Sequence, residues 1–306
     1  VLPWQLSAQS SIKAEKLKFG LIADVHQDIM HDGVERLQAF INESTSKKME
    51  FIMQLGDFCR PYDYNQPFLD VWEQFKGPKY HLLGNHDTDG GFTRQQAMDF
   101  WGMKSRYYSF DKSGYHFVVL DGNDPNPKPW PGYHRYIDKD QQEWLKNDLK
   151  NTNLNTFVFS HQTLENEDGG IDNQKEVRQI LEEANKEAGF TKVVASICGH
   201  HHTDYMTQIN GVYYVQINSA SYRWVGGDYQ HIRYSKEIDE KYPWIKYTIP
   251  YKDPLFTFVE INPKGYLTIE GSKTEFVGIG PKEMNLAEKS PNNPVVPKIS
   301  DFKMKF

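Results

Sequence analysis

The chain has 306 residues, which is enough for one large α/β domain with a sizeable core or for two small domains. Its formal net charge is −6 at pH 7 and its charged residues are interspersed, so no basic tract offers a surface for a nucleic-acid backbone. No apolar run approaches the ~20 residues that a membrane-spanning helix needs, and the two cysteines decide little about redox compartment.

The N-terminal segment, residues 1–18, contains Leu6-Ser7-Ala8, which resembles the small-residue cleavage site at the end of a processed export signal. An ordinary flexible terminus is the alternative interpretation of the same residues. Between the two, we expect an exported protein, periplasmic or extracellular, in preference to a cytoplasmic one.

From residue 19 onward, strand-like runs alternate with segments in which apolar residues recur at helical spacing, namely 33–44, 138–151 and 173–188. Five of the strand-like runs end in a short polar motif. Since ligands bind where loops leave the carboxyl ends of strands in open α/β sheets, the five motifs can converge on one site. The runs and their motifs are 19–23 before Asp24-Val25-His26, 51–55 before Gly56-Asp57, 80–83 before Gly84-Asn85-His86-Asp87, 157–159 before Ser160-His161, and 193–198 before Gly199-His200-His201-His202.

After residue 202 the pattern becomes strand-rich, and residues 262–265 make the turn of a hairpin. Because the motifs spread over most of the length, we expect a single domain over 19–280. An extended tail over 281–306 follows, which its prolines keep from being one helix. Its last residues, 299–306, are candidates for an edge strand.

Residues 222–251 form an aromatic-rich loop with two interpretations. The functional one is a lid or substrate wall near the motifs, and the structural one is a loop that packs on the body with its own aromatic rings. We expect a mixture, weighted toward packing. The aromatic residues are Tyr222, Trp224, Tyr229, Tyr234, Tyr242, Trp244, Tyr247 and Tyr251.

Several other polar residues have a plain structural interpretation. We expect Cys59 and Cys198 to be buried free thiols, with a disulfide as the alternative. Asp28 fits equally a carboxylate behind His26 and a loop-surface residue. Five isolated histidines are expected to be structural or simply exposed: His31, His81, His116, His134 and His231.

The motifs supply nitrogen and oxygen donors, which suit borderline transition-metal ions. Asp24 and His26 stand two residues apart, as do His200 and His202, and on an extended backbone this spacing puts both side chains of a pair on one face. We therefore exclude His201 as a ligand. With a negative net charge, affinity for any anionic ligand must come from local metal ions.

The motif string D-x-H, G-D, G-N-H-D, H and G-H-x-H, over residues 24–202, resembles the calcineurin-like metallophosphoesterase family. The resemblance implies an α/β fold in which two mixed β-sheets pack as a sandwich flanked by helices, with a dimetal site at the loop edge. It implies two divalent metal ions, of which Mn, Fe and Zn are the strongest candidates. Asp57 would bridge both ions. Asp24, His26 and His202 would bind one ion, and Asn85, His161 and His200 would bind the other.

The resemblance also implies that His86 is catalytic: it binds no metal and acts on the substrate phosphate and the leaving oxygen. Asp87 would hold the ring of His86 in place. Phe58-Cys59-Arg60 follow Asp57 where the purple acid phosphatase branch has a tyrosine, which argues against an iron–tyrosinate centre. A branch with glutamine at the position of His26 is disfavoured as well.

These features predict a dimetal-dependent phosphoesterase that hydrolyses small phosphate mono- or diesters by direct attack of a metal-bridging hydroxide. Two metals ~3.5–4 Å apart lower the pKa of a shared water from ~15.7 toward ~7. The alternative is a non-catalytic binding protein on the same fold, which the filled ligand positions and His86 disfavour. The motifs leave the choice between monoester and diester, and the oligomeric state, open.

Overall fold

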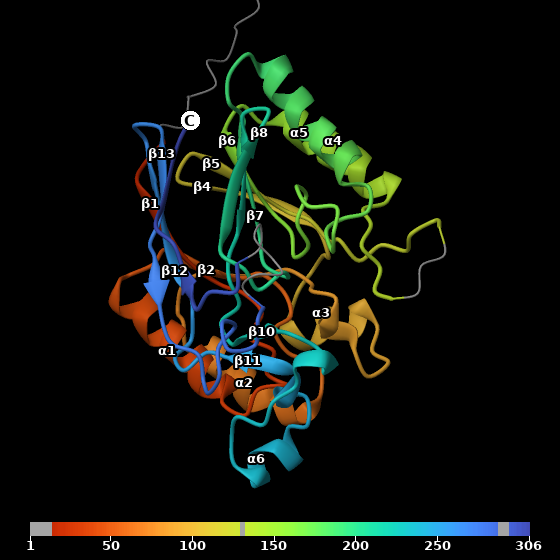
Figure 1. Ribbon diagram of the computed structural model, residues 1–306. Coiled ribbons are helices and arrows are strands. Elements are labelled where there is room, and N and C mark those ends of the chain that lie inside the picture. Colours follow the sequence, from red (N-terminus) through yellow and green to blue (C-terminus); the bar gives the residue numbers. More distant parts are fainter. Residues whose placement is uncertain (1–13, 129–131, 287–293) are drawn as a thin grey trace, which may run out of the picture.

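The computed structural model describes residues 14–128, 132–286 and 294–306, so the cleavage-like residues 6–8 lie outside the described residues. Two six-stranded sheets face each other, and helices cover their outer surfaces, as Figure 1 shows. Both sheets combine parallel and antiparallel strands. The expected sandwich of two mixed sheets flanked by helices is confirmed.

The first sheet has the strand order β16-β13-β12-β1-β2-β3. Its parallel part consists of β1 (Leu17–Ile22), β2 (Phe51–Gln54) and β3 (Lys79–His81). Its antiparallel part consists of β12 (Thr257–Asn262), β13 (Tyr266–Ile269) and β16 (Phe302–Lys305). The hairpin turn at 262–265 and the C-terminal edge strand are therefore both confirmed.

The second sheet has the strand order β4-β5-β6-β7-β9-β8, with antiparallel strands at both edges. Its strands are β4 (Tyr108–Lys112), β5 (Tyr115–Val119), β6 (Asn155–Phe159), β7 (Val193–Cys198), β8 (Tyr205–Ile209) and β9 (Val212–Gln216). Two short pairs lie outside the sheets: β10 (Tyr222–Trp224) with β11 (Thr248–Pro250), and β14 (Ser272–Lys273) with β15 (Lys298–Ile299).

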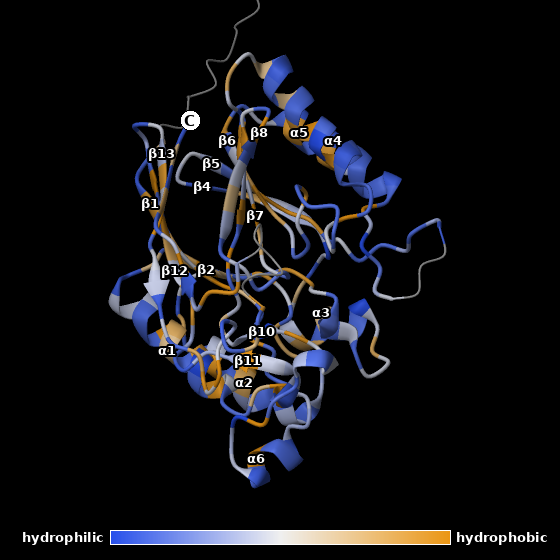
Figure 2. Ribbon diagram, viewed as in Figure 1, coloured by the Kyte–Doolittle hydropathy of each residue, from blue (hydrophilic) through white to orange (hydrophobic). Residues whose placement is uncertain are grey.

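Three helices pack on the first sheet, namely α1 (Gly33–Ser46), α2 (Gln66–Trp72) and α3 (Arg94–Trp101). Helices α4 (Lys139–Asn151) and α5 (Gln174–Ala188) pack on the second sheet, and their outer surfaces are hydrophilic, as Figure 2 shows. Asp138 caps α4 as expected, because its side chain accepts the backbone N–H of Gln141. The short helix α6 is Lys236–Lys241, and the 3₁₀ turns are η1 (Asp63–Asn65), η2 (His86–Thr88), η3 (Gly227–Tyr229) and η4 (Ile245–Tyr247).

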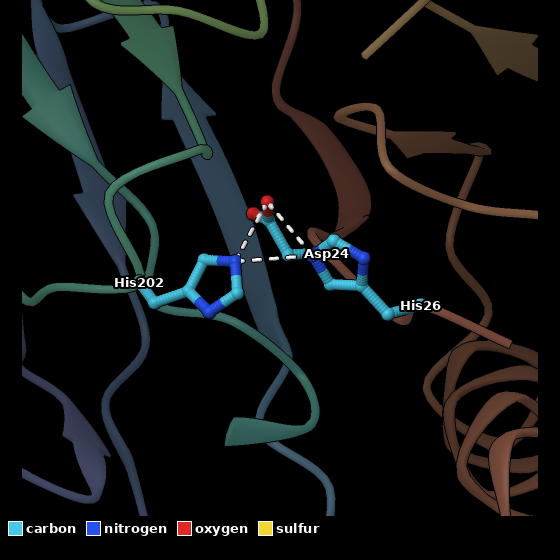
Figure 3. Close-up of side chains that lie close together, drawn as sticks. All are labelled: Asp24, His26 and His202. Atoms are coloured by element: carbon cyan, nitrogen blue, oxygen red, sulfur yellow. Dashed lines mark hydrogen bonds and ion pairs between the residues drawn. The ribbon is translucent and has the colours of Figure 1, made fainter. Parts of the chain in front are cut away.

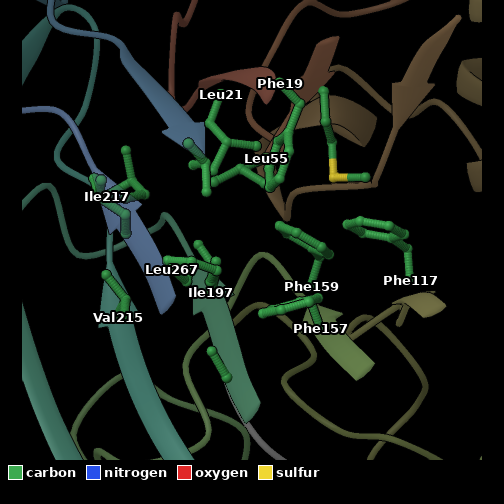
Figure 4. Packing of buried hydrophobic residues seen from close by; sticks show 14 of the residues in the cluster. Phe19, Leu21, Leu55, Phe117, Phe157, Phe159, Ile197, Val215, Ile217 and Leu267 are labelled. Atoms are coloured by element: carbon green, nitrogen blue, oxygen red, sulfur yellow. The ribbon is translucent and has the colours of Figure 1, made fainter. Parts of the chain in front are cut away.

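Strand periodicity assigns each apolar side chain to one of the packed layers. Phe117 and Val119 of β5 point into the core between the sheets, whereas Val118 packs under α4 and α5. In the central core Phe19 stacks on Phe51 at a ring-centroid distance of 4.5 Å. Figure 4 shows Phe19 of the first sheet close to Phe117 and Phe159 of the second, whose ring centroids lie 5.8 and 6.4 Å from that of Phe19. This core fixes the two sheets against each other, so their loop edges meet at one end.

Two further expectations can be checked on the described residues. Cys59 and Cys198 are both buried and free, as expected. No helix within the described part of the chain is both long and apolar enough to cross a membrane.

Candidate metal centre

The five motifs do come together, at the carboxyl ends of parallel strands from both sheets. The loop after β1 carries Asp24 and His26, the loop after β2 carries Asp57, and β3 leads into the turn of Asn85 and His86. From the second sheet, β6 leads to His161 and β7 to His200 and His202. The site therefore depends on the docking of one sheet against the other.

One group of donors consists of Asp24, His26 and His202, all buried, whose ligand atoms lie within 4.8 Å of one another. His202 Nε2 lies 3.2 Å from Asp24 Oδ1 and 3.2 Å from His26 Nε2. Figure 3 shows both imidazole rings turned toward the Asp24 carboxylate. Two imidazole nitrogens and a carboxylate facing one point suit a transition-metal ion.

The second group consists of Asp57, His161 and His200. His161 Nε2 lies 3.1 Å from Asp57 Oδ2 and 3.2 Å from His200 Nδ1. Asn85 Oδ1 is buried and has no hydrogen-bond partner among the described residues, as a metal-ligating oxygen would. The donor set of this group therefore also fits a divalent ion.

Asp57 connects the two groups. Its Oδ2 atom lies 3.1 Å from His161 Nε2 of the second group and 3.6 Å from His26 Nε2 of the first. Burial opposes ionisation of Asp57, but the adjacent imidazoles, His161 foremost among them, together outweigh it and hold the pKa of this carboxyl well below its usual value. In turn, burial would lower the pKa of His161, but Asp57, Asp24 and the Leu55 carbonyl together raise it to about 10. Positive charge beside Asp57 is thus strongly stabilised.

The backbone at these residues is left-handed, not extended. The φ angles are 51° at Asp24, 50° at His26, 50° at Asp57, 72° at His200 and 50° at His202. Our argument from an extended backbone is therefore wrong in its geometry, and His200 and His202 belong to different groups. Such conformations cost on the order of 1–3 kcal/mol each and cluster at functional sites.

Two glycines in the motifs are required by close approach. A Cβ atom at Gly84 would collide with Asp57, and one at Gly199 would collide with the Asp24 carboxylate. Because glycine has no Cβ atom, these two positions let the loops of different strands touch at the carboxylates.

His201 and Asp28 lie outside the metal groups. His201 Nε2 donates to the backbone oxygen of Asp168 at 2.8 Å, which agrees with its exclusion as a ligand. Asp28 accepts hydrogen bonds from the Arg60 backbone N–H and from the Asn65 side chain, so it anchors a loop and does not support the ring of His26.

The structure corrects the role expected for Asp87. Its carboxylate accepts the backbone N–H groups of Asp57, Phe58 and Gly84 at 2.7–2.9 Å, so it fixes the loop of the bridging aspartate. The ring of His86 is held by Asp89 instead, with 2.7 Å between Nδ1 and Oδ2. The reason is the 3₁₀ turn at this point: residues three apart eclipse one another, whereas adjacent side chains diverge.

A cavity of about 610 Å³ opens over both metal groups. Arg60, Asp89 and Tyr133 in its wall were missed by the sequence analysis. The eclipsed spacing from His86 could have indicated Asp89, and Arg60 follows Asp57 closely, but no local signal marks Tyr133. The lining residues are His26, Ile29, Asp57, Arg60, His86, Asp89, Gly90, Tyr133, His200, His202, Tyr222, Trp224 and Trp244.

Comparison with known proteins agrees with this geometry. The family profile described as calcineurin-like phosphoesterase matches residues 17–204, more than half of the chain. The chain belongs to the calcineurin-like phosphoesterase family. Over 152 residues it is 28% identical to a manganese-dependent ADP-ribose/CDP-alcohol diphosphatase of Arabidopsis thaliana, covering 41% of this chain and 48% of the relative. The chain thus spans about half the length of the curated relatives that it matches.

Two solved structures illustrate the fold that this chain shares with other proteins. A dimetal phosphatase from Danio rerio superposes with a TM-score of 0.61 at 14% identity, covering 86% of this chain and 99% of that one. GAP50 of Plasmodium, the anchor in the inner membrane complex, superposes with a TM-score of 0.55 at 16% identity, covering 95% of this chain and 89% of GAP50. At these identities the likeness concerns the fold alone.

Proposed function

We propose that this calcineurin-like phosphoesterase is a dimetal-dependent hydrolase of small phosphoric esters. The observation that carries the proposal is the convergence of two three-residue donor groups on the shared carboxylate of Asp57, inside one cavity. In this proposal Asp57 bridges the ions. Asp24, His26 and His202 bind one ion, and Asn85, His161 and His200 bind the other.

The bound ions would supply an activated water and neutralise the phosphoryl oxygens as charge develops. The manganese in the relatives' name makes Mn²⁺ the first ion to test. Backbone carbonyls support the ligand role of the imidazoles: His161 Nδ1 donates to Leu55 O and His202 Nδ1 donates to Tyr222 O, each at 2.7 Å. These bonds leave Nε2 of each ring with a free lone pair for a metal ion.

His86 would serve the leaving group. Its Nδ1 faces Asp89, which leaves Nε2 as the nitrogen that can exchange a proton with the substrate. A proton delivered to the departing oxygen lowers the barrier most for poor leaving groups. Asp87 contributes indirectly, because it holds the loop of Asp57 by three backbone hydrogen bonds.

The cavity extends beyond the phosphate site to Trp224 and Trp244, which are 45% and 54% exposed. This apolar wall favours a substrate whose phosphoryl group carries a further, planar organic group. Diphosphates such as those in the relatives' name, ADP-ribose and CDP-alcohols, are of this kind and are the first substrates to test.

The test compares the wild-type chain with Asp57→Asn, and uses the surface variant Asp70→Asn as the matched control. Metal content is measured after loading with Mn²⁺, and hydrolysis is measured on p-nitrophenyl phosphate, its bis ester and ADP-ribose. We expect two ions per chain and turnover of at least one probe in the wild type and the control. We expect loss of both in Asp57→Asn, because an amide has no net charge to share between two cations. A wild type that binds both ions and hydrolyses none of the probes would favour a binding protein on this fold.

A further inference from the structure

Nδ1 of His86 has two neighbours that come from different parts of the chain. Asp89 Oδ2 lies 2.7 Å away, and the hydroxyl of Tyr133 lies 3.0 Å away. The same hydroxyl donates to Asp89 Oδ1 at 2.9 Å, so the three side chains close a ring of hydrogen bonds. The Tyr133 ring also meets the His86 ring edge to face, with 4.6 Å between centroids.

This arrangement requires hydrogen on Nδ1, whether the imidazole is neutral or positively charged. A carboxylate only accepts, so the nitrogen beside Asp89 must carry hydrogen. The single hydroxyl hydrogen of Tyr133 goes to Asp89, so its oxygen can only accept from His86. Both partners therefore require hydrogen on Nδ1. Nε2 of His86 is then the nitrogen left for the cavity.

Resting on the proposed function, we propose that Tyr133 is a positioning residue for His86. It acts together with Asp89 to fix the tautomer and the orientation of the imidazole. Arg60 supports the pair, because its Nη2 atom lies 3.2 Å from Asp89 Oδ2 and can form a charge-assisted hydrogen bond to that carboxylate. The metal groups meet His86 at other atoms: Asp57 Oδ1 accepts the His86 backbone N–H at 2.8 Å, and the His26 ring lies 5.5 Å from the His86 ring between centroids.

The segment that carries Tyr133 is anchored at both ends. Asp124 N–H donates to Tyr136 O at 3.0 Å, and Tyr136 N–H donates to Gly122 O at 2.8 Å. The connection between β5 and α4 is thus pinned where it leaves and re-enters the domain. Tyr133 is 43% exposed, so packing of its ring alone does not explain its position over His86.

The kinetic test uses Tyr133→Phe, Asp89→Asn and His86→Ala, with Tyr64→Phe as the matched control. Tyr64 donates to Asp28 at 3.1 Å and is 66% exposed, but it does not line the cavity. On aryl phosphates with leaving groups of graded pKa, Tyr133→Phe should lower kcat about tenfold with KM nearly unchanged, because one hydrogen bond to the ring is lost. The loss should be smallest for p-nitrophenyl phosphate, because p-nitrophenol is a good leaving group that needs little protonation. Tyr64→Phe should match the wild type.

The decisive comparison is made in the His86→Ala background. If Tyr133 acts through His86, Tyr133→Phe causes no further loss there, because coupled residues are not additive. A further tenfold loss in that background, or a rise in KM alone, would show that Tyr133 contacts the substrate directly and would overturn the proposal.

A second readout does not depend on activity. In the zinc-loaded protein, the ¹⁵N shifts of the His86 ring report which nitrogen carries hydrogen. We expect the Nδ1–H form in the wild type and a mixture of both forms in Asp89→Asn/Tyr133→Phe. Predominance of Nε2–H in the wild type would overturn the proposal. If the shifts show the Nδ1–H form but the protein hydrolyses none of the probes, the proposed function is wrong and the positioning of His86 by Tyr133 stands.

Discussion

At the residue scale, the candidate metal centre is organised by groups that never touch a metal ion themselves. Carbonyl oxygens of Leu55 and Tyr222 set the tautomers of His161 and His202, and the Asp87 carboxylate holds the loop of Asp57. These contacts fix the direction of each donor before any ion binds. Preorganisation of this kind lowers the cost of assembling a metal site.

The neighbouring pair His200 and His201 gives the sharpest residue-scale test. His200 Nδ1 lies 3.2 Å from His161 Nε2, whereas His201 bonds to the Asp168 backbone on the other side. We expect His200→Ala to lose about one of the two metal equivalents and His201→Ala to keep both. Metal analysis of the two purified variants checks this, and equal losses would show that His201 is a ligand.

At the scale of single elements, the aromatic segment 222–251 has two parts with different roles. Tyr234 and Tyr242 pack on Ile29, Met30 and Ile245 in a small cluster, and Tyr222 belongs both to this cluster and to the cavity wall. Trp224 and Trp244 line the cavity as well and contact Tyr247, with ring centroids 6.0 and 5.6 Å away. The expected mixture of packing and wall therefore matches the geometry.

Truncation of the two indoles should change substrate choice more than stability. A buried Trp→Ala change costs ~3–5 kcal/mol, and these half-exposed rings should cost well below that. We expect Trp224→Ala and Trp244→Ala to lower kcat/KM for ADP-ribose several-fold relative to p-nitrophenyl phosphate. Trp144→Ala is the matched control, because Trp144 packs on Tyr107 of the body and does not line the cavity. Unfolding midpoints and the ratio of kcat/KM for the two substrates are measured on the same samples. A large stability loss with an unchanged ratio would show that the two indoles serve packing and do not form a substrate wall.

His116 joins two strands of the second sheet to helix α4 and has the structural role expected for it. From β5 its ring contacts Asp111 of β4 at 2.6 Å and Asp148 of α4 at 2.7 Å. Burial alone would lower the pKa of His116, but these carboxylates outweigh it and raise the pKa above the usual 6.5. A raised pKa in the folded state adds stability that is complete below about 6.5 and disappears as pH rises through the folded value.

The consequence is a pH-dependent effect of His116→Gln. We expect this variant to lower the thermal midpoint clearly at pH 6 and less at pH 9, because the stabilising charge of wild-type His116 is lost as pH rises through its raised pKa. Thermal melts of both proteins across this range measure the difference. A larger effect at pH 9 than at pH 6 would contradict the charged pairing.

At the scale of the whole molecule, the site joins the two sheets. The first sheet contributes the Asp24 and Asp57 carboxylates, 0% and 2% exposed, and the second contributes His161, His200 and His202. Buried carboxylates are costly unless cations or hydrogen bonds compensate them. Bound ions should therefore stabilise the docking of the sheets as well as act in catalysis.

Metal loading should raise the unfolding temperature of the entire chain. An ion at 100 times its Kd adds ~2.7 kcal/mol to the stability of the folded state, which corresponds to a shift of several degrees. We expect Mn²⁺ to produce this shift and EDTA to reverse it. Asp57→Asn should respond far less, whereas Asp70→Asn should respond like the wild type. An equal shift in Asp57→Asn would place the stabilising ions elsewhere.

The sequence by itself determined the strands, the main helices and the motifs at the strand ends, because these patterns are local. Apolar alternation sets which face of β5 is buried, and Asp138 caps α4 whatever lies nearby. Membership of the family likewise follows from a motif string that needs no coordinates.

Only the tertiary structure decided which side chain meets which. The turn at residues 86–88 aims Asp87 at the Asp57 loop and Asp89 at His86, although the two carboxylates look alike in sequence. Tyr133 reaches His86 across 47 residues through the path of a connection that no local pattern describes. Such contacts depend on turn geometry and on the docking of two sheets, and both arise from the packed core as a whole.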